Sequence, residues 1–507
     1  MNVYLWAIMD AQFQQLIRDQ LADISQSLAH LLPEYLIAGA ILLLLILDIW
    51  AGKWKDHGMF ALSLLSLLAA IYFSDFSFPT DLFEKNLRID SLSTFGKYLF
   101  AGIAIVCLSF QKFSHQEEKS LSEDTPNYSI WMGLILGLYF LSMSLNFLYI
   151  YLSLEIISIC SYLLTAWNKQ ERISAEAGLK YLIFGATASA IMLYGISLIY
   201  GFGGSLQPTD PAFLTALESI PLEAQLLAFS LFLAGFLFKI AAFPFHFWAP
   251  DVYEAIPFPL AAFFSVAPKA GGFIVLVRLL DCLANSSIYD PLLILLGLLA
   301  VLSMTVGNLL ALRQKDIKRL LAYSGIAHTG FLLMAIICLK GLGLASLLFY
   351  LTIYSLLNLS AFMLGAYFTQ SSQSVSFLEW QGLGKHMTFA AILLSISFAG
   401  LIGLPPTAGF IAKWYVFVSL FEQSQGGLSN FWVILIIAGI VNSLISIYYY
   451  LLPLIQLFFK KSTAPIAAQK ARFELAISSL LLFPVMVLGV YGFDGLFKLF
   501  QSFMESS

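Results

Sequence analysis

The sequence predicts an all-α polytopic membrane protein with about fourteen transmembrane helices. Only 11% of its 507 residues are charged and 60% are hydrophobic, whereas soluble domains carry about 25% charged residues. A chain this apolar has too few polar groups to cover a surface in water, but lipid surrounds membrane helices in place of water. The net charge of −4 is small for this length, so we expect a lipid bilayer around the chain and no nucleic-acid partner.

Apolar stretches of the length that a bilayer requires, about 20 residues, recur along the chain. The run from residue 127 to residue 167 is about twice that length, so we divide it near Ser144–Asn146. Residues 1–32 mix acidic and apolar side chains and lack the basic start and cleavage site of a signal peptide, which predicts an interfacial helix. The predicted spans are residues 33–50, 58–75, 92–111, 127–143, 145–167, 174–201, 223–245, 256–280, 289–311, 317–339, 343–368, 387–421, 430–459 and 472–499.

Alternate loops between these spans carry clusters of lysine and arginine, whereas residues 202–222 and 422–429 contain neither. The positive-inside rule places the basic loops in the cytoplasm, and fourteen spans then put both termini on the other side. The N-terminal stretch does not resemble a transit peptide rich in arginine and serine, which favours the inner (plasma) membrane of a bacterial cell. The clusters are Lys53 and Lys55, Lys112 and Lys119, Lys169 and Arg172, Arg313 and Lys315, and Lys460, Lys461 and Lys470.

Several ionisable residues lie inside the predicted spans, flanked by apolar or small residues. A charge at mid-membrane costs about 2.5–3.5 kcal/mol on insertion scales, so such residues are functional candidates. Burial favours the neutral amine of a lysine and a nearby carboxylate favours its charged form, so a buried lysine beside a movable acid is a switchable proton site. We expect Glu155 to meet Lys239. The residues predicted to relay protons are Glu155, Lys180, Lys239, Lys269, His328 and Lys413.

These residues also have structural interpretations. A lysine near a helix end extends to the lipid headgroups, which applies to Lys180 and more strongly to Lys97, beside a polar loop. Glu155 and Lys239 would then form one inert buried ion pair, and His328 would be a core histidine hydrogen-bonded to a neighbour. The four cysteines lie far apart in the sequence, so we expect no disulfide framework, metal site or iron–sulfur cluster.

Prolines accompany three of the lysines and predict interrupted helices. Proline removes a backbone donor, and non-helical backbone at membrane depth survives only beside protein or water. The pattern GFxxK occurs at residues 235–239 and 409–413, in the seventh and twelfth predicted spans. Because these spans are an odd number of helices apart, two five-helix units would be inverted relative to each other, a transporter pattern. Pro244 follows Lys239, Pro268 precedes Lys269, and Pro405 and Pro406 precede Lys413.

Four longer strings carry a family resemblance. FKIAAFPFHFWAPDVYEAIPFP (238–259), DIKRLLAYSGIAHTGF (316–331) and PPTAGFIAKWYVF (405–417) resemble the antiporter-like subunits of the proton-pumping NADH–quinone oxidoreductase, respiratory complex I. AGLKYLIFGATASAIMLYG (177–195) resembles subunit N within that family. The resemblance covers nearly the whole chain from Pro33 onward.

The resemblance implies a proton-translocating subunit of the membrane arm of this enzyme. It implies that Glu155 pairs with Lys239, that Lys269 continues the proton path, that Lys413 leads to the outer side, and that Lys180 matches a sixth-helix lysine. It implies no cofactor in this chain: NADH, FMN, iron–sulfur clusters and ubiquinone or menaquinone would act in other subunits. Subunit M and small membrane subunits would be its partners.

The same family has inverted five-helix repeats at helices 4–8 and 9–13, interrupted at helices 7 and 12. This implies five segments: 1–32 as the N-terminal interfacial segment, 33–126 as helices 1–3, 127–282 and 283–460 as the two repeats, and 461–507 as the last helix and C-terminus.

Two other functions stay open from the sequence. A subunit of a multisubunit cation/proton antiporter would resemble this fold and share its buried lysines. A structural spacer of the membrane arm would not need buried charges, because leucine would serve there. A lysine relay favours H⁺ over Na⁺, since an ammonium group offers no lone pair to a metal cation.

Overall fold

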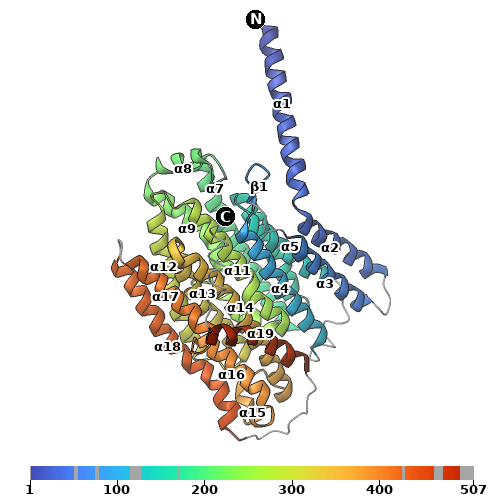
Figure 1. Ribbon diagram of the computed structural model, residues 1–507, viewed down its shortest axis with the longest axis vertical. Helices are drawn as coiled ribbons and strands as arrows, with labels where there is room; N and C mark the ends of the chain where they lie inside the picture. The colour runs from blue at the N-terminus through green and yellow to red at the C-terminus, as the bar shows by residue number, and fades with distance from the viewer. Residues whose placement is uncertain are drawn as a thin grey trace.

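The chain forms a bundle of apolar helices, and one long helix, α1 (Asn2–Ala29), stands apart from it (Figure 1). The computed structural model describes residues 2–50, 55–74, 79–114, 127–168, 171–424, 429–461 and 472–491. The helix α1 agrees with the predicted N-terminal helix, and α2 (Leu32–Trp50) and α3 (Lys55–Phe73) follow as the first two spans. Lys53, Lys119, Lys169, Lys470 and the end of the last predicted span, 492–499, lie outside the described residues.

A short β-hairpin joins α3 to α4, so the fold is nearly but not entirely helical. Strand β1 (Thr80–Leu82) pairs antiparallel with β2 (Leu87–Ile89). Strands of three residues are too short to show the alternation from which strands are predicted, so the sequence analysis missed them. Arg88 donates to Asp81 at 2.6 Å across the hairpin, and this hydrogen bond raises the pKa of Arg88. We call the end of the bundle that carries this hairpin the hairpin end.

The transmembrane bundle confirms the predicted set of spans. Twelve helices in the described part of the chain are long and apolar enough to cross a membrane, and two shorter apolar helices, α5 and α16, join them. After α2 and α3, the bundle consists of α4 (Ser91–Phe113), α5 (Asn127–Met143), α6 (Phe147–Thr165), α7 (Arg172–Gly203), α9 (Leu222–Lys239), α11 (Phe258–Cys282), α12 (Tyr289–Ala311), α13 (Ile317–Ile336), α14 (Leu344–Ser372), α16 (Thr388–Ile402), α17 (Ala408–Ser424), α18 (Ser429–Phe459) and α19 (Arg472–Tyr491).

Shorter helical segments connect these spans. They are α8 (Pro211–Glu218), α10 (Trp248–Ala255), α15 (Leu383–His386), a π-helical turn η1 (Leu339–Gly343) and a 3₁₀ turn η2 (Phe377–Glu379).

The division of the long apolar run 127–167 is confirmed. Helix α5 ends at Met143 and α6 begins at Phe147. Asn146 caps α6 by accepting a hydrogen bond from the backbone N–H of Leu148 at 2.8 Å. The backbone N–H of Asn146 donates to the carbonyl of Asn86 in the hairpin at 3.3 Å, so this turn is fixed at the hairpin end.

Two spans are interrupted where the prolines predicted interruption. The seventh span stops as α9 at Lys239 and resumes as α10 at Trp248. The twelfth stops as α16 at Ile402 and resumes as α17 at Ala408. Pro268, in contrast, lies inside the continuous helix α11. The inverted relation of the two five-helix repeats stays a prediction.

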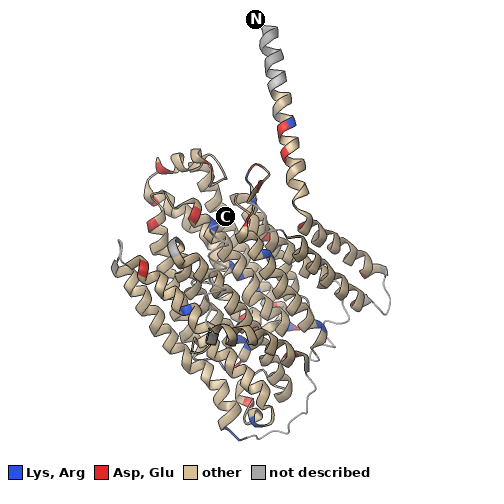
Figure 2. Ribbon diagram, in the orientation of Figure 1, with Lys and Arg blue, Asp and Glu red and all other residues tan. Residues whose placement is uncertain are grey.

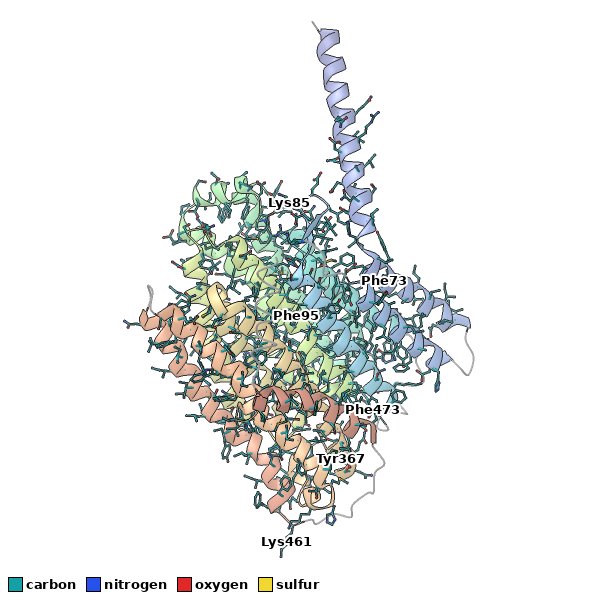
Figure 3. All side chains as sticks on the ribbon, viewed as in Figure 1. Phe73, Lys85, Phe95, Tyr367, Lys461 and Phe473 are labelled. Carbon is teal, nitrogen blue, oxygen red and sulfur yellow. The ribbon has the colours of Figure 1, made fainter. Side chains whose placement is uncertain are left out.

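The centre of the bundle is formed by α11, α13 and α14. The spanning segment of α11 is buried along its whole length, and α13 and α14 are buried along most of theirs. Charged residues are sparse along the helices (Figure 2). The side chains of Lys97, Lys239, Lys269 and Lys413 are buried in the bundle. Lys85 lies at the hairpin end and Lys461 at the opposite end of the molecule (Figure 3).

Candidate functional site: a buried chain of ionisable residues

Five of the six predicted residues lie on helices around the centre of the bundle. Lys239, Lys269, His328 and Lys413 are at most 5% exposed, and Glu155 is partly exposed. Their helices α9, α11, α13 and α17 contact one another in that order, and Lys239 contacts α6, which carries Glu155. The structure thus brings these five residues into one series across the bundle.

Two serine hydroxyls lie where a direct contact between Glu155 and Lys239 was expected. Ser189 on α7 donates a hydrogen bond to Glu155, and Lys239 donates to Ser158 at 3.3 Å. Ser158 is three residues after Glu155 on α6, so both side chains project from the same face of that helix. Among the described side chains Glu155 and Lys239 form no ion pair, so the expected direct contact is absent and each charge has a serine hydroxyl as its partner.

Side chains outside α9 donate to backbone carbonyls at the break after Lys239. The indole N–H of Trp248 donates to the carbonyl of Phe238 at 3.0 Å. The carbonyl of Phe238 also accepts from the backbone N–H of Ala241 at 3.0 Å. Thr329 on α13 donates to the carbonyl of Ile240 at 2.9 Å. Non-helical backbone is tolerated at membrane depth where other parts of the protein surround it and supply hydrogen bonds. Lys239 is therefore held at a helix C-terminus, where the helix dipole favours a positive charge.

Lys269 reaches from α11 to the backbone of α13. Its ammonium donates to the carbonyl of Gly325 at 2.8 Å. A Cβ at Gly325 would lie 3.0 Å from that nitrogen and 3.2 Å from the hydroxyl oxygen of Tyr354, so glycine permits the close approach. Asn358 donates to Tyr354 at 3.2 Å and to Ser265 at 2.6 Å, which extends the polar contacts around Lys269.

His328 lies on α13 between two tyrosine hydroxyls. Its Nδ1 is 2.9 Å from the hydroxyl of Tyr350 and its Nε2 is 3.2 Å from that of Tyr450. The ring of Tyr354 lies 5.0 Å from the imidazole, centre to centre. Both ring nitrogens thus have partners, as the structural interpretation expects. The ring contact with Tyr354 places His328 beside the polar groups around Lys269.

Lys413 lies beside the break between α16 and α17. Its ammonium donates to the carbonyls of Leu401 at 3.1 Å and Ile402 at 2.8 Å, and lies 3.5 Å from the hydroxyl of Ser443 on α18. The carbonyls at the end of α16 lack helical donors because the helix stops there. A small cavity lies between Lys413 and His328, so the last two members of the series share one space.

A polar cleft opens at the end of the bundle opposite the hairpin. It has a volume of about 190 Å³ and lies among α5, α6, α10, α11 and α13. Thr165, Glu171 and Lys318 contribute to its lining. Lys318 donates to the carbonyl of Ile256 at 2.7 Å, so one wall of the cleft carries a fixed positive charge.

Lys180 lies apart from the buried series. Its side chain is 43% exposed on α7 and forms ion pairs of 3.0 Å with Glu176 and with Asp251. Arg319 contacts the same Asp251 at 3.0 Å. Lys180 is thus part of a surface network in this chain, and its relay role stays a prediction.

Comparison with known proteins places this geometry in a family. Residues 144–446 match the family described as NADH:quinone oxidoreductase/Mrp antiporter, transmembrane. NADH-quinone oxidoreductase subunit N 2 of Sorangium cellulosum is 38% identical, over 92% of this chain and 95% of the relative. This chain belongs to the NADH:quinone oxidoreductase/Mrp antiporter family.

Solved structures of the family share the fold. A chain of respiratory complex I from Thermus thermophilus with bound aureothin has a TM-score of 0.76 and 28% identity, covering 92% of this chain and 98% of that one. A chain of the Mrp complex from Dietzia sp. has a TM-score of 0.75 at 18% identity, covering 92% of this chain and 50% of that one. The second likeness shows the common fold alone.

The family region contains all six predicted residues but leaves out α1 to α4, where the structure holds a buried ion pair that the sequence analysis missed. Lys97 on α4 lies 2.6 Å from Glu34 on α2, with side chains 3% and 2% exposed. The expectation that Lys97 extends to the headgroups is therefore wrong. The signal available in the sequence was Glu34 itself, an acid at the start of the first apolar run.

Proposed function

We propose that this chain is a proton-translocating subunit of the membrane arm of an NADH–quinone oxidoreductase, of the type of subunit N. The observation that carries the proposal is the series Glu155, Lys239, Lys269, His328 and Lys413 on neighbouring helices, in which each side chain contacts a hydroxyl or a backbone carbonyl. The relative from Sorangium cellulosum, named as a subunit of such an enzyme over nearly its whole length, supports the same assignment.

The proposed path runs from the cleft opposite the hairpin through the buried series. Protons enter through the cleft and load Lys239 and Lys269. While Glu155 is charged and close, it favours the ammonium form of Lys239, and its withdrawal favours the neutral amine and release of the proton. The proton then passes by way of Tyr354 and His328 to Lys413, whose side chain lies at the break leading into α17.

The rest of the proposal concerns the surroundings of the chain. Electrons pass from NADH to quinone in other subunits, which hold FMN and the iron–sulfur clusters, and this chain uses no cofactor of its own. Its neighbours are subunit M and small membrane subunits. The end opposite the hairpin faces the cytoplasm of a bacterial cell, and both termini lie on the other side. Lys112, Lys315 and Lys461, at helix ends away from the hairpin, support this orientation.

The deciding experiment compares Lys239→Ala with Lys85→Ala in the assembled complex, reconstituted into vesicles. NADH-driven proton uptake and quinone reduction are measured on the same vesicles. We expect Lys239→Ala to lower proton uptake by about tenfold or more, because a positioned proton carrier is lost. Lys85 is an exposed lysine at the hairpin tip, so Lys85→Ala should behave as the wild type. Normal uptake in Lys239→Ala would refute the relay and favour a structural spacer.

A multisubunit cation/proton antiporter is the second candidate, and the shared fold of the Dietzia Mrp chain supports it. Membranes from a strain lacking this chain separate the two functions. Loss of NADH–quinone activity supports the oxidoreductase, whereas loss of cation/proton exchange with intact NADH–quinone activity supports the antiporter.

A further inference from the structure

A second group of buried ionisable side chains lies among α2, α4 and α5, outside the series from Glu155 to Lys413. Glu34 and Lys97 form an ion pair of 2.6 Å, and both side chains are almost completely buried. The ammonium of Lys97 lies 5.8 Å from the centre of the Tyr139 ring on α5. Lys97 is six residues from the start of α4, about 9 Å along the helix, so the pair lies within the spanning segment.

Polar atoms in this group lack hydrogen-bond partners within the described part of the chain. Glu34 Oε2 and the hydroxyl of Tyr139 are both buried and have none. A buried polar atom left in this state costs about 1–3 kcal/mol. A bound water or an added proton would satisfy both atoms, because a buried water commonly bridges two or more polar groups. The group therefore has the chemistry of a proton-binding site.

The free energy of folding does not explain why Glu34 and Lys97 are charged residues. Two apolar residues of similar volume in place of a buried ion pair are often neutral or stabilising, by about 1–4 kcal/mol. The first turn of α2 lowers the cost for Glu34, because a helix N-terminus favours negative charge. The dipole of α4 does not stabilise the positive charge of Lys97, which lies in the interior of that helix. Ionisable residues inside spanning helices with no packing advantage indicate a functional site.

A row of polar groups leads from this pair towards the hairpin end. Asp90 precedes Lys97 by seven residues, about two turns, and so lies on the same face of α4. Asp90 forms an ion pair of 2.7 Å with Arg278, and Arg278 also donates to the carbonyl of Ser142 at 3.0 Å. Ser142 is three residues beyond Tyr139 on α5 and donates to its carbonyl at 2.7 Å.

Apolar packing separates the pair from the main series. Where α4, α5 and α11 meet, Phe100, Leu138 and Leu141 surround Gly271, two residues beyond Lys269. Ile274 packs against Gly96, the residue next to Lys97. Ser142 also lies near Gly96, but its hydroxyl donates to the carbonyl of Tyr139. In the described structure Lys97 pairs with Glu34 and Lys269 donates to Gly325, and no hydrogen bond joins the two lysines.

We propose that Glu34, Lys97 and Tyr139 form a second proton-transfer site, reached from the hairpin end and separate from the series between Glu155 and Lys413. A proton moves from the ammonium of Lys97 to the carboxylate of Glu34, which turns the ion pair into a neutral amine and a neutral acid. A proton that reaches Lys97 from the end of the bundle opposite the hairpin restores its ammonium, and Glu34 releases its own proton towards the hairpin end. One proton then crosses the site and the ion pair is regenerated. The proposal rests on the proton-translocating function proposed above.

The test uses the double variant Glu34→Leu/Lys97→Leu in the assembled complex. If the pair is inert, removal of both charges should leave assembly and proton uptake unchanged. If it transfers protons, the complex should assemble and NADH-driven proton uptake should fall about tenfold or more. The matched control is Asp81→Asn/Arg88→Gln, which removes the exposed ion pair of the hairpin and should pump normally.

Two further variants separate the possible failures. Tyr139→Phe removes only an unpartnered hydroxyl, so assembly should be intact and proton uptake should fall severalfold. Normal uptake in Tyr139→Phe, or in an assembled double variant, would overturn the second site. If Lys239→Ala blocks uptake while the Glu34/Lys97 double variant pumps normally, only this inference fails. If Lys239→Ala also pumps normally, the proposed function itself fails.

Discussion

The ammonium of Lys413 lies 2.8 Å from the carbonyl oxygen of Ile402, the last residue of α16. The interruption of this span therefore supplies the acceptors that hold the lysine. Carbonyls at a helix C-terminus carry a partial negative charge and favour a nearby cation. Lys239 lies at the break of the seventh span as the last residue of α9, before the break, whereas Lys413 lies after the break on α17. In both spans a lysine meets the end of an interrupted helix.

We expect Lys413→Arg to retain part of the contact with α16 but to block proton transfer, because a guanidinium does not deprotonate in proteins. Lys413→Met removes both the contact and the proton. Both variants should lower NADH-driven proton uptake by about tenfold or more, whereas Lys413→Met should also lower the Tm of the complex. Vesicle uptake and thermal unfolding together check this. Full proton uptake in Lys413→Arg would remove Lys413 from the path.

Gly325→Ala should slow proton transfer without unfolding the protein. The new Cβ would lie 3.0 Å from the ammonium of Lys269 and 3.2 Å from the Tyr354 hydroxyl, so both groups must shift by a few tenths of an ångström. We expect a severalfold fall in proton uptake with an unchanged amount of assembled complex. Gly102→Ala is the matched control, since nothing lies within 4 Å of a Cβ there. Alanine in a helix should stabilise that control by about 0.5–1 kcal/mol. Equal proton uptake in the two variants would show that the close contact between Gly325 and Lys269 does not affect proton transfer.

The sequence allowed the buried series to be predicted better than the Glu34–Lys97 pair, for a physical reason. Lys239 and Lys269 are conspicuous because apolar residues surround them on both sides in the chain. Glu34 and Lys97 each lie near the start of an apolar run, where a lysine is expected to reach the headgroups. Only the packing of α2 against α4, distant in sequence, reveals that both are buried. The hydroxyls of Ser158 and Ser189 were missed likewise, because serine is common in membrane helices.

A double-mutant cycle on His328 and Tyr450 should measure how much the contact between these two side chains contributes to stability, which is the structural role of His328. Interhelical hydrogen bonds in membranes are worth about 0.6–2 kcal/mol, so Tyr450→Phe should lower the free energy of unfolding by that amount. The loss should become smaller in a His328→Ala background, because one partner of the Tyr450 hydroxyl is gone, while Ser324 and Tyr449 remain beside it. Tyr253→Phe is the control, since its buried hydroxyl has no partner in the described structure. Additive effects of the two changes would mean that the 3.2 Å contact contributes no stability.

The Asp90–Arg278 pair should carry a large and pH-dependent part of the stability at the hairpin end. Burial alone would raise the pKa of Asp90, but two hydrogen bonds of 2.7 and 2.8 Å from Arg278 outweigh it and hold that pKa below its ordinary value. A carboxyl with a lowered folded pKa stabilises the fold at every pH above its unfolded pKa of about 3.9. That contribution is lost as the pH falls through the lower folded pKa. Asp90→Asn keeps a good helix cap but leaves Arg278 charged and unpaired, which costs about 3–5 kcal/mol near neutral pH.

The measurement is the Tm of wild type and Asp90→Asn across pH. The two curves should lie far apart near neutral pH, begin to approach each other below about pH 4 and meet only below the lowered folded pKa of Asp90, because the protonated carboxyl then resembles asparagine. The double variant Asp90→Asn/Arg278→Met should recover much of the loss, since it leaves no unpaired charge. Asp81→Asn at the exposed pair with Arg88 should cost at most about 1 kcal/mol. A gap between wild type and Asp90→Asn that persisted to strongly acidic pH would mean that the ionised form of Asp90 does not stabilise the fold.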